Sequence, residues 1–218
     1  EKAYTPNFDK IVKTGASAKA LVPIFISKTF PNHYSIATGM YAENHGLIAN
    51  SFYAPDLDKT YSIRDRKAVE NGQFYDGEPI WVTAENQGVK TASYFWVGSE
   101  ASINGVQPTY WKRYDQKASF ESRIDTVMTW FSYPINRRPR LALLYFHEPD
   151  GTGHEYGPNS PEIVMQIERL DNVLGNLISK INKLDISSKL NVIIVSDHGM
   201  IDVYPENSID LSSYTDLS

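Results

Sequence analysis

Two Asp/His pairs in the sequence have the residue types and the spacing of metal ligands. Asp197 and His198 are adjacent, and Asp150 and His154 lie four residues apart in a Gly-containing segment. Carboxylate oxygens and imidazole nitrogens are the ligands that a catalytic zinc site uses when thiolates are absent, and the chain contains no cysteine. A single pair of this kind more often forms a turn or a hydrogen-bonded pair. The prediction of metal binding therefore depends on the presence of both.

Thr29 is the candidate nucleophile. It precedes Pro31, which can begin a helix running to Gly39, so the Thr29 hydroxyl is expected at the positive end of that helix, where backbone amides favour an anionic phosphate. A threonine hydroxyl is a weak nucleophile at neutral pH unless a metal or a base activates it. The simpler alternative is that Thr29 only caps the helix. The nucleophile hypothesis thus depends on the two metal-ligand pairs.

The elements that must position these residues are typical of an α/β fold. Residues 140–146 and 190–196 are nearly continuous apolar runs, which predicts buried parallel strands, and residues 88–96 form a shorter third candidate. Between the first two, residues 161–183 carry one apolar stripe and predict a long amphipathic helix with Ser160 as its N-cap. This order predicts a parallel crossover unit. In such folds ligands bind beyond the carboxyl ends of the strands, and each Asp/His pair follows the carboxyl end of one predicted strand. We further expect helices over 31–40, 78–88 and 119–131, and an irregular surface excursion over 51–77.

Composition narrows the possible functions. The 218 residues are 41% hydrophobic and 22% charged, with a net charge of −5 and no cluster of Lys or Arg. We therefore expect no nucleic-acid groove and no anionic membrane face. No apolar run is long enough to span a bilayer. The absence of cysteines and of Asn-x-Ser/Thr sequons favours a bacterial source.

Several motifs, in their order along the chain, resemble the nucleotide pyrophosphatase/phosphodiesterase family of the alkaline-phosphatase-like superfamily. The resemblance implies an alkaline-phosphatase-like fold with a mostly parallel sheet and helices on both faces. It also implies two divalent metal ions, zinc as the first expectation, about 4 Å apart. The matching segments are 28–34 (KTFPNHY), 38–41 (TGMY), 45–46 (HG), 50–53 (NSFY), 77–84 (GEPIWVTA), 95–96 (FW), 148–158 (EPDGTGHEYGP) and 196–200 (SDHGM).

The resemblance also implies roles for individual residues. Thr29 matches the nucleophile, which touches the metals. Asp197 and His198 match ligands of the metal that activates it, and Asp150 and His154 match ligands of a second metal, which positions the hydrolytic water. These assignments predict hydrolysis through a covalent threonine intermediate.

Three further residues match substrate-binding positions. Asn50 matches an amide that holds a phosphate oxygen, and Phe30 and Tyr114 match an aromatic pair that sandwiches a nucleobase. The expected substrate is a small nucleoside 5′-phosphodiester or pyrophosphate, cleaved to a nucleoside monophosphate. One alternative is an enzyme of the same superfamily that cleaves choline-type or lipid-type phosphodiesters or phosphomonoesters. The other is a non-catalytic fragment. His33 and His45 match positions that are not ligands, and the role of His147 stays open.

The resemblance further implies that residues 1–218 are one partial catalytic domain. By alignment it lacks the N-terminal strand with one metal-binding Asp and the C-terminal part with the last metal-binding His. We therefore expect each metal site to be one ligand short, and this chain alone to be weakly active or inactive. The family implies a periplasmic, cell-surface or secreted location, and no oligomeric state follows from the sequence.

Overall fold

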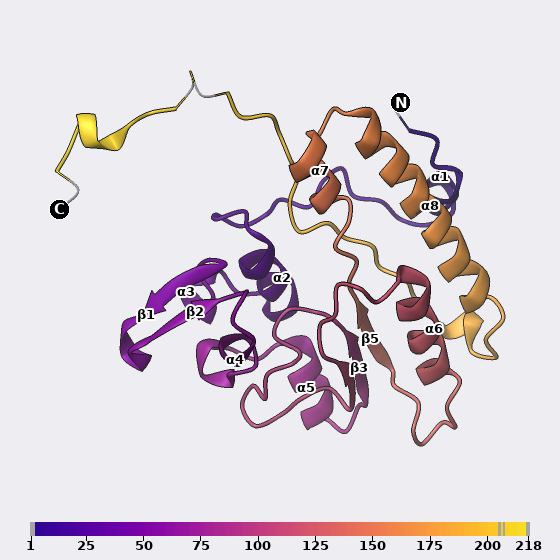
Figure 1. The fold of residues 1–218 in the computed structure, drawn as a ribbon. Coiled ribbons are helices and arrows are strands. Elements are labelled where there is room, and N and C mark those ends of the chain that lie inside the picture. Colours follow the sequence, from indigo (N-terminus) through magenta and orange to yellow (C-terminus); the bar gives the residue numbers. More distant parts are fainter. Residues whose placement is uncertain (1–2, 205, 207, 217–218) are drawn as a thin grey trace.

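A three-stranded parallel sheet lies at the centre of the computed structural model, which describes residues 3–204, 206 and 208–216. The strands are β3 (Thr91–Tyr94), β4 (Tyr110–Lys112) and β5 (Leu141–Leu144), in the order β4-β3-β5. Thr91 pairs with Leu141 and Tyr94 with Leu144, in parallel register. All four β3 residues are buried, because helices cover both faces of this central strand (Figure 1). The strands predicted over 88–96 and 140–146 are confirmed.

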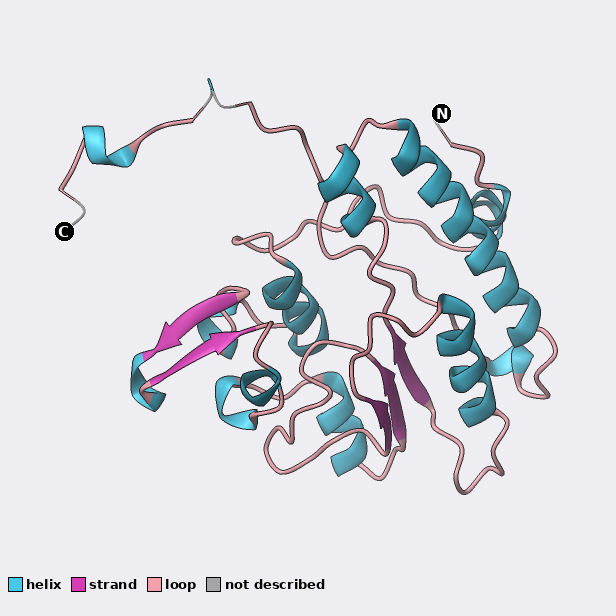
Figure 2. Cartoon of the chain, in the orientation of Figure 1, coloured by secondary structure: helices cyan, strands magenta, loops and turns pink. Residues whose placement is uncertain are grey.

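The helices lie in two groups on opposite faces of this sheet, as Figure 2 shows in the same orientation. One face packs against a cluster that includes Tyr34 and Trp81, and the other against a cluster that includes Ile124 and Val173. Within the described residues no helix is long and apolar enough to cross a membrane. The helices are α1 (Pro6–Thr14), α2 (Thr29–Thr38), α3 (Ala42–His45), α4 (Arg66–Val69), α5 (Ile80–Asn86), α6 (Phe120–Phe131), α7 (Asp150–Tyr156) and α8 (Pro161–Ile181), with short 3-10 turns at Pro55–Leu57, Gly72–Phe74, Ser187–Lys189 and Leu211–Ser213.

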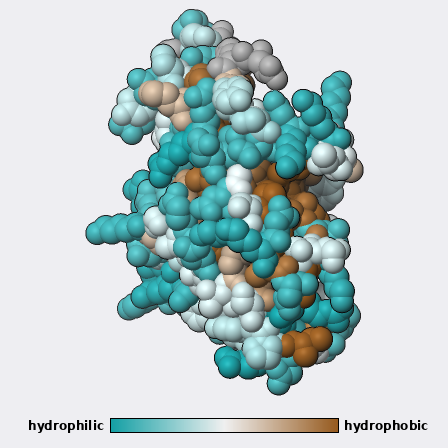
Figure 3. Space-filling model, turned by 90° about the vertical axis from the view of Figure 1, so that its right-hand side faces the viewer, coloured by the Kyte–Doolittle hydropathy of each residue, from teal (hydrophilic) through white to brown (hydrophobic). Residues whose placement is uncertain are grey.

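Helix α8 confirms the long amphipathic helix that the sequence predicts. The Ser160 hydroxyl accepts a hydrogen bond from the Ile163 N–H at 3.2 Å, and Pro161 occupies the first turn. These are the expected N-cap and N1 residues. Apolar side chains of α8 pack towards β5 and α6. The side of the molecule shown in Figure 3 is mostly hydrophilic and carries an apolar patch.

The strand predicted over 190–196 is wrong for the described part of the chain, where no strand pairs with this segment. The segment is extended and exposed, and Ile193 is 85% accessible. An apolar run indicates a preference for burial, but a strand also needs backbone hydrogen bonds to a neighbouring edge. The crossover from β5 through α8 therefore ends in an unpaired segment.

The irregular surface excursion expected over 51–77 is also wrong. Its first part is an antiparallel hairpin of β1 (Ser51–Ala54) and β2 (Lys59–Ser62), in which Ser51 pairs with Ser62. Tyr61 and Tyr75 from this region are buried in the core. Their hydroxyls lie 2.9 Å apart, and the Tyr75 hydroxyl donates to the Val69 carbonyl. Tyrosine suggested a surface in the sequence, but its ring is buried here because the hydroxyl finds partners.

Helix α1 is attached to α8 by the carboxylate of Asp171, which is only 1% exposed. This carboxylate accepts hydrogen bonds from the backbone N–H groups of Asn7 and Phe8 at 3.0 and 2.8 Å, and from the Asn7 side chain at 2.7 Å. The approach is close, because a Cβ at Gly175 would lie 2.7 Å from Asn7 Oδ1. Asp171 therefore caps α1 from a different helix.

We expect Asp171→Ala to lower the free energy of unfolding by about 1–3 kcal/mol, because it leaves several donors without their acceptor. Urea unfolding of the full-length protein measures this change. The matched control is Asp125→Ala, which removes an exposed ion pair between α6 and Lys180 of α8 and should cost about 0.5 kcal/mol or less. Equal effects of the two substitutions would contradict a capping role for Asp171.

Candidate active site

Thr29 is the first residue of α2, and Lys28, with extended backbone, is the N-cap. The capping alternative for Thr29 is therefore wrong, and the helix begins two residues earlier than predicted. Pro31 is tolerated there because the first turn of a helix has no acceptor for its N–H groups. The Thr29 side chain thus lies at the positive end of the α2 dipole.

The imidazole of His198 has its Nε2 atom directed at Thr29. Its Nδ1 lies 2.9 Å from the Gly199 carbonyl, which can only accept, so Nδ1 carries the proton that it donates. Nε2 lies 3.3 Å from Thr29 Oγ1, 3.2 Å from Asp197 Oδ2 and 3.8 Å from Asp150 Oδ1. Three oxygen atoms thus surround one nitrogen. Carboxylates this close to an imidazole lone pair call for a positive charge, either a proton on Nε2 or a cation.

Asp150 and His154 lie one turn apart on the helix α7. This spacing places both side chains on one face of the helix, with His154 Nε2 3.4 Å from Asp150 Oδ1. The helix start is fixed by Glu148, which accepts from the Thr152 N–H and hydroxyl at 3.0 and 2.9 Å. Both predicted pairs therefore meet at one place, with Asp150 bordering on His198.

Thr29, Asp150, His154, Asp197 and His198 form one cluster of side chains. The donor atoms of this cluster are of the kinds that bind a divalent cation. Asp150 Oδ1 is buried and receives no hydrogen bond in the described structure. A buried carboxylate oxygen without a donor is costly unless a cation neutralises it. In the described residues, however, no three His, Asp or Glu side chains are arranged to hold one ion, and the contacts are pairwise.

His33 is part of the cluster, which sequence reasoning missed. Its Nδ1 donates to the Thr29 carbonyl at 2.8 Å and lies 3.3 Å from Asp197 Oδ2. Its ring packs at 5.1 Å against both Trp96 and Tyr145. Burial would raise the pKa of Asp197, but the hydrogen bond and charge of His33, with the charge of His198, lower it. The spacing of four residues between Thr29 and His33 on a predicted helix could have indicated this contact.

Of the three predicted substrate-binding residues, Asn50 and Phe30 lie at the start of α2, next to Thr29. Asn50 Oδ1 accepts from the Phe30 N–H at 3.1 Å, which places the Asn50 amide beside the first turn of α2. The Phe30 ring packs 6.3 Å from Tyr61, and the Tyr114 ring packs 5.0 Å from Phe95. In the part of the chain that the structure describes, the rings of Phe30 and Tyr114 belong to different apolar clusters and do not touch each other.

The segment that leads from β5 to Asp150 is held by Arg123, which is fully buried. Arg123 donates to the Tyr145 carbonyl at 2.9 Å and to His147 Nδ1 at 3.2 Å. Burial lowers the pKa of His147, and the positive charge of Arg123 lowers it further. His147 is therefore a neutral acceptor that fixes the loop.

A family model for type I phosphodiesterase / nucleotide pyrophosphatase matches residues 1–218. The chain is 43% identical over 195 residues to human ectonucleotide pyrophosphatase/phosphodiesterase family member 1, covering 89% of this chain and 21% of the relative. It is 40% identical over 211 residues to venom phosphodiesterase CdcPDE of Crotalus durissus collilineatus, covering 97% and 25%. The chain thus spans only about a fifth to a quarter of these curated relatives.

A solved structure of murine ectonucleotide pyrophosphatase/phosphodiesterase 5 superposes with a TM-score of 0.88 at 34% identity. The match covers 99% of this chain and 57% of that chain. That structure is an inactive variant, with one threonine replaced by alanine, in complex with AMP. The alkaline-phosphatase-like fold class is confirmed. All of these relatives are animal proteins, so the bacterial source stays a prediction.

Proposed function

Because this chain belongs to the type I phosphodiesterase/nucleotide pyrophosphatase family, we propose that the full-length protein hydrolyses nucleoside 5′-phosphodiesters or pyrophosphates to nucleoside monophosphates. The observation that carries the proposal is the position of Thr29 Oγ1 at the start of α2, 3.3 Å from His198 Nε2 and next to both Asp/His pairs. AMP in the complex of the murine relative supports a nucleotide as the ligand. The names of the relatives, ectoenzymes and venom enzymes, support a cell-surface or extracellular location.

In the first step the Thr29 oxygen attacks phosphorus in line with the leaving group. A Thr29 O–P bond forms, the bond from phosphorus to the leaving oxygen breaks, and the leaving group takes a proton from solvent. The Thr29 hydroxyl gives its proton to solvent, and a cation held by Asp197 and His198 next to this hydroxyl would favour the loss of that proton. The threonine-to-alanine substitution in the inactive murine variant supports a threonine in this role.

In the second step a water oxygen attacks the phosphothreonine diester. The new O–P bond releases Thr29, which regains its proton, and the nucleoside monophosphate leaves. The α2 N-terminus and the Asn50 amide, which is anchored on the Phe30 N–H, are placed to bind the negative phosphate oxygens. No other group of the chain needs to bond to phosphorus.

We assign Asp197, His198 and Thr29 to one divalent cation and Asp150 and His154 to a second, with zinc as the expected metal. When bound, such cations stabilise the negative charge of phosphoryl transfer as Lewis acids. The buried Asp150 oxygen without a donor supports this assignment. We assign Phe30 and Tyr114 to opposite sides of a nucleobase. A base can lie between the two rings only if the rings do not touch each other.

The substrate class is tested by comparing three chromogenic esters on the full-length protein. We expect 4-nitrophenyl thymidine 5′-phosphate to be cleaved with a kcat/KM at least about tenfold above 4-nitrophenyl phosphorylcholine and 4-nitrophenyl phosphate, because base stacking adds binding energy. A preference for phosphorylcholine or for the monoester would overturn the nucleotide assignment in favour of the two alternatives.

A further inference from the structure

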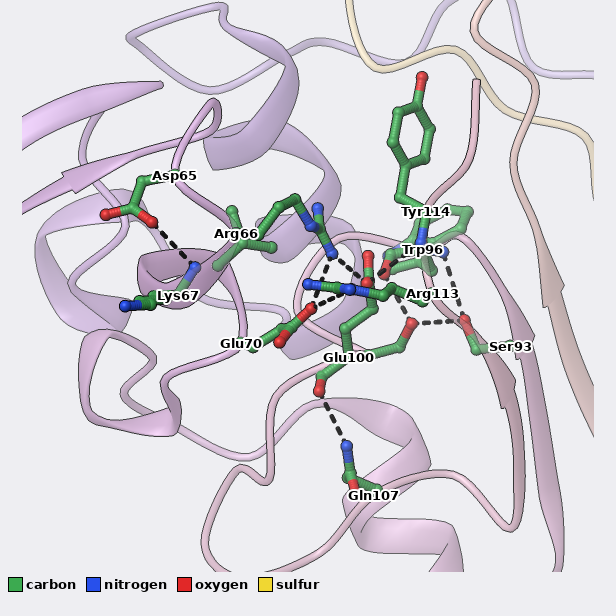
Figure 4. A network of polar contacts seen from close by, with 12 residues as sticks. Asp65, Arg66, Lys67, Glu70, Ser93, Trp96, Glu100, Gln107, Arg113 and Tyr114 are labelled. Atoms are coloured by element: carbon green, nitrogen blue, oxygen red, sulfur yellow. Dashed lines mark hydrogen bonds and ion pairs between the residues drawn. The ribbon is translucent and has the colours of Figure 1, made fainter. Parts of the chain in front are cut away.

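Tyr114 is held by a buried carboxylate that the proposed reaction does not use. Glu100 Oε2 accepts a hydrogen bond from the Tyr114 backbone N–H at 3.1 Å, and the Glu100 side chain is only 6% exposed. The same oxygen pairs with the guanidinium of Arg66, which reaches across from α4 (Figure 4). The Glu100 backbone is itself fixed, because Gln107 Nε2 donates to its carbonyl at 2.8 Å. The carboxylate thus links the backbone at Tyr114 to a distant helix.

A second ion pair holds the preceding residue in the same network. Arg113 Nε donates to Glu70 Oε1 at 2.6 Å, and Glu70 lies 3.4 Å from Arg66. The charges alternate from Glu100 to Arg66, Glu70 and Arg113, as Figure 4 shows. Both ends of this network act on the same piece of chain, one through the Tyr114 N–H and the other through the Arg113 side chain.

The ring of Tyr114 rests on Phe95, with centroids 5.0 Å apart and planes at 63°. Phe95 follows β3 and has a positive φ of 74°, a backbone conformation that non-glycine residues rarely adopt. Residues in such conformations persist where the surroundings fix them and often border functional sites. Beyond Phe95 lies the buried Arg123, 4.9 Å from the ring centroid. Tyr114 is therefore supported under its ring as well as along its backbone.

Stability alone is a poor explanation for this arrangement. Burial raises the pKa of Glu100, although the Tyr114 N–H and the charge of Arg66 oppose the rise. Well-packed apolar side chains often stabilise a fold as well as a buried ion pair does, because they avoid the desolvation cost. What a charged acceptor does supply is a fixed position for the N–H that it binds.

We propose that Glu100 and Arg66 are positioning residues that set the place of the Tyr114 ring and so tune the affinity for the nucleobase. This inference rests on the proposed function, in which Tyr114 stacks on the base. Neither Glu100 nor Arg66 needs to touch the substrate. Their effect is therefore expected on substrates that contain a base and not on those that lack one.

The test measures full-length Glu100→Ala on 4-nitrophenyl thymidine 5′-phosphate and on methyl 4-nitrophenyl phosphate, which has no base. We expect the KM for the nucleotide to rise about fivefold to tenfold with kcat nearly unchanged, since stacking is weakened. The kcat/KM for the methyl ester should stay within about twofold of wild type, because no stacking is involved. Equal losses on both esters would overturn the inference and indicate a merely structural role.

A double-mutant cycle with Tyr114→Ala gives a second, independent outcome. If Glu100 acts through the Tyr114 ring, Glu100→Ala should raise the nucleotide KM no further once the ring is absent. Simple addition of the two effects would overturn the inference. Should Glu100→Ala fail to fold, Glu100→Gln keeps an acceptor for the Tyr114 N–H and removes only the charge opposite Arg66. It is then compared with Arg66→Gln, and both should raise only the nucleotide KM. If wild type cleaves neither ester, the proposed function fails, which is a different result.

Discussion

Replacing Thr29 with alanine is expected to reduce kcat of the full-length protein by about 10⁴-fold or more, because it removes the oxygen that attacks phosphorus. Thr29→Ser should keep part of the activity, since a hydroxyl remains in the same place. Turnover of 4-nitrophenyl thymidine 5′-phosphate measures both changes. A covalent phosphothreonine should be trapped by acid quench in wild type and be absent in the alanine variant.

The matched control lies at the other end of the same helix. The Thr38 hydroxyl donates to the Tyr34 carbonyl at 2.9 Å, away from the cluster. Thr38→Ala should therefore leave kcat nearly unchanged, and thermal melting should show that both alanine variants are folded. Near-normal kcat in Thr29→Ala would require the covalent mechanism to be abandoned.

The second large effect is expected on removing divalent cations. Chelation with EDTA should lower turnover by about a thousandfold or more, and added zinc should restore it, because the cations stabilise charge in phosphoryl transfer. The thermal midpoint should fall on chelation and rise again with zinc, since a cation offsets the repulsion among Asp150, Asp197 and the facing imidazole nitrogen.

Asp150→Asn separates this site from a loosely bound surface metal. The variant should lose metal, as measured by elemental analysis, and at least about 100-fold in turnover, because a neutral amide is a weaker ligand than a carboxylate. Asp185→Asn is the control, since this exposed carboxylate contacts only Arg138 among the described ion pairs and lies in another part of the chain. Full metal content and normal turnover in Asp150→Asn would exclude Asp150 as a ligand.

The behaviour of residues 190–198 explains why the candidate site forms although a predicted strand does not. The segment up to Ser196 is unpaired and exposed in the described structure. Asp197 and His198 nevertheless reach the cluster, because side-chain contacts with His33 and Thr29 hold them there. Side-chain contacts at the loop, and not strand pairing, are what fix these two residues.

The sequence alone determined the local features of this protein. An apolar stripe with Ser160 and Pro161 at its start predicts α8 because amphipathic spacing and capping are properties of consecutive residues. The pairing of Asp with His in two short segments likewise selects the residues that the structure brings together. These signals lie within a few residues of each other, so they can be read without knowing the fold.

Tertiary structure alone decided the relations between distant segments. The contact of His33 with Asp197, the buried tyrosines of 51–77 and the bond from Glu100 to the Tyr114 N–H each join residues that no local pattern links. The failure of 190–196 to form a strand has the same origin, since pairing depends on an edge elsewhere in the chain. Burial and partners are set by packing over the whole fold, and the same side chain can be surface or core depending on what folds against it.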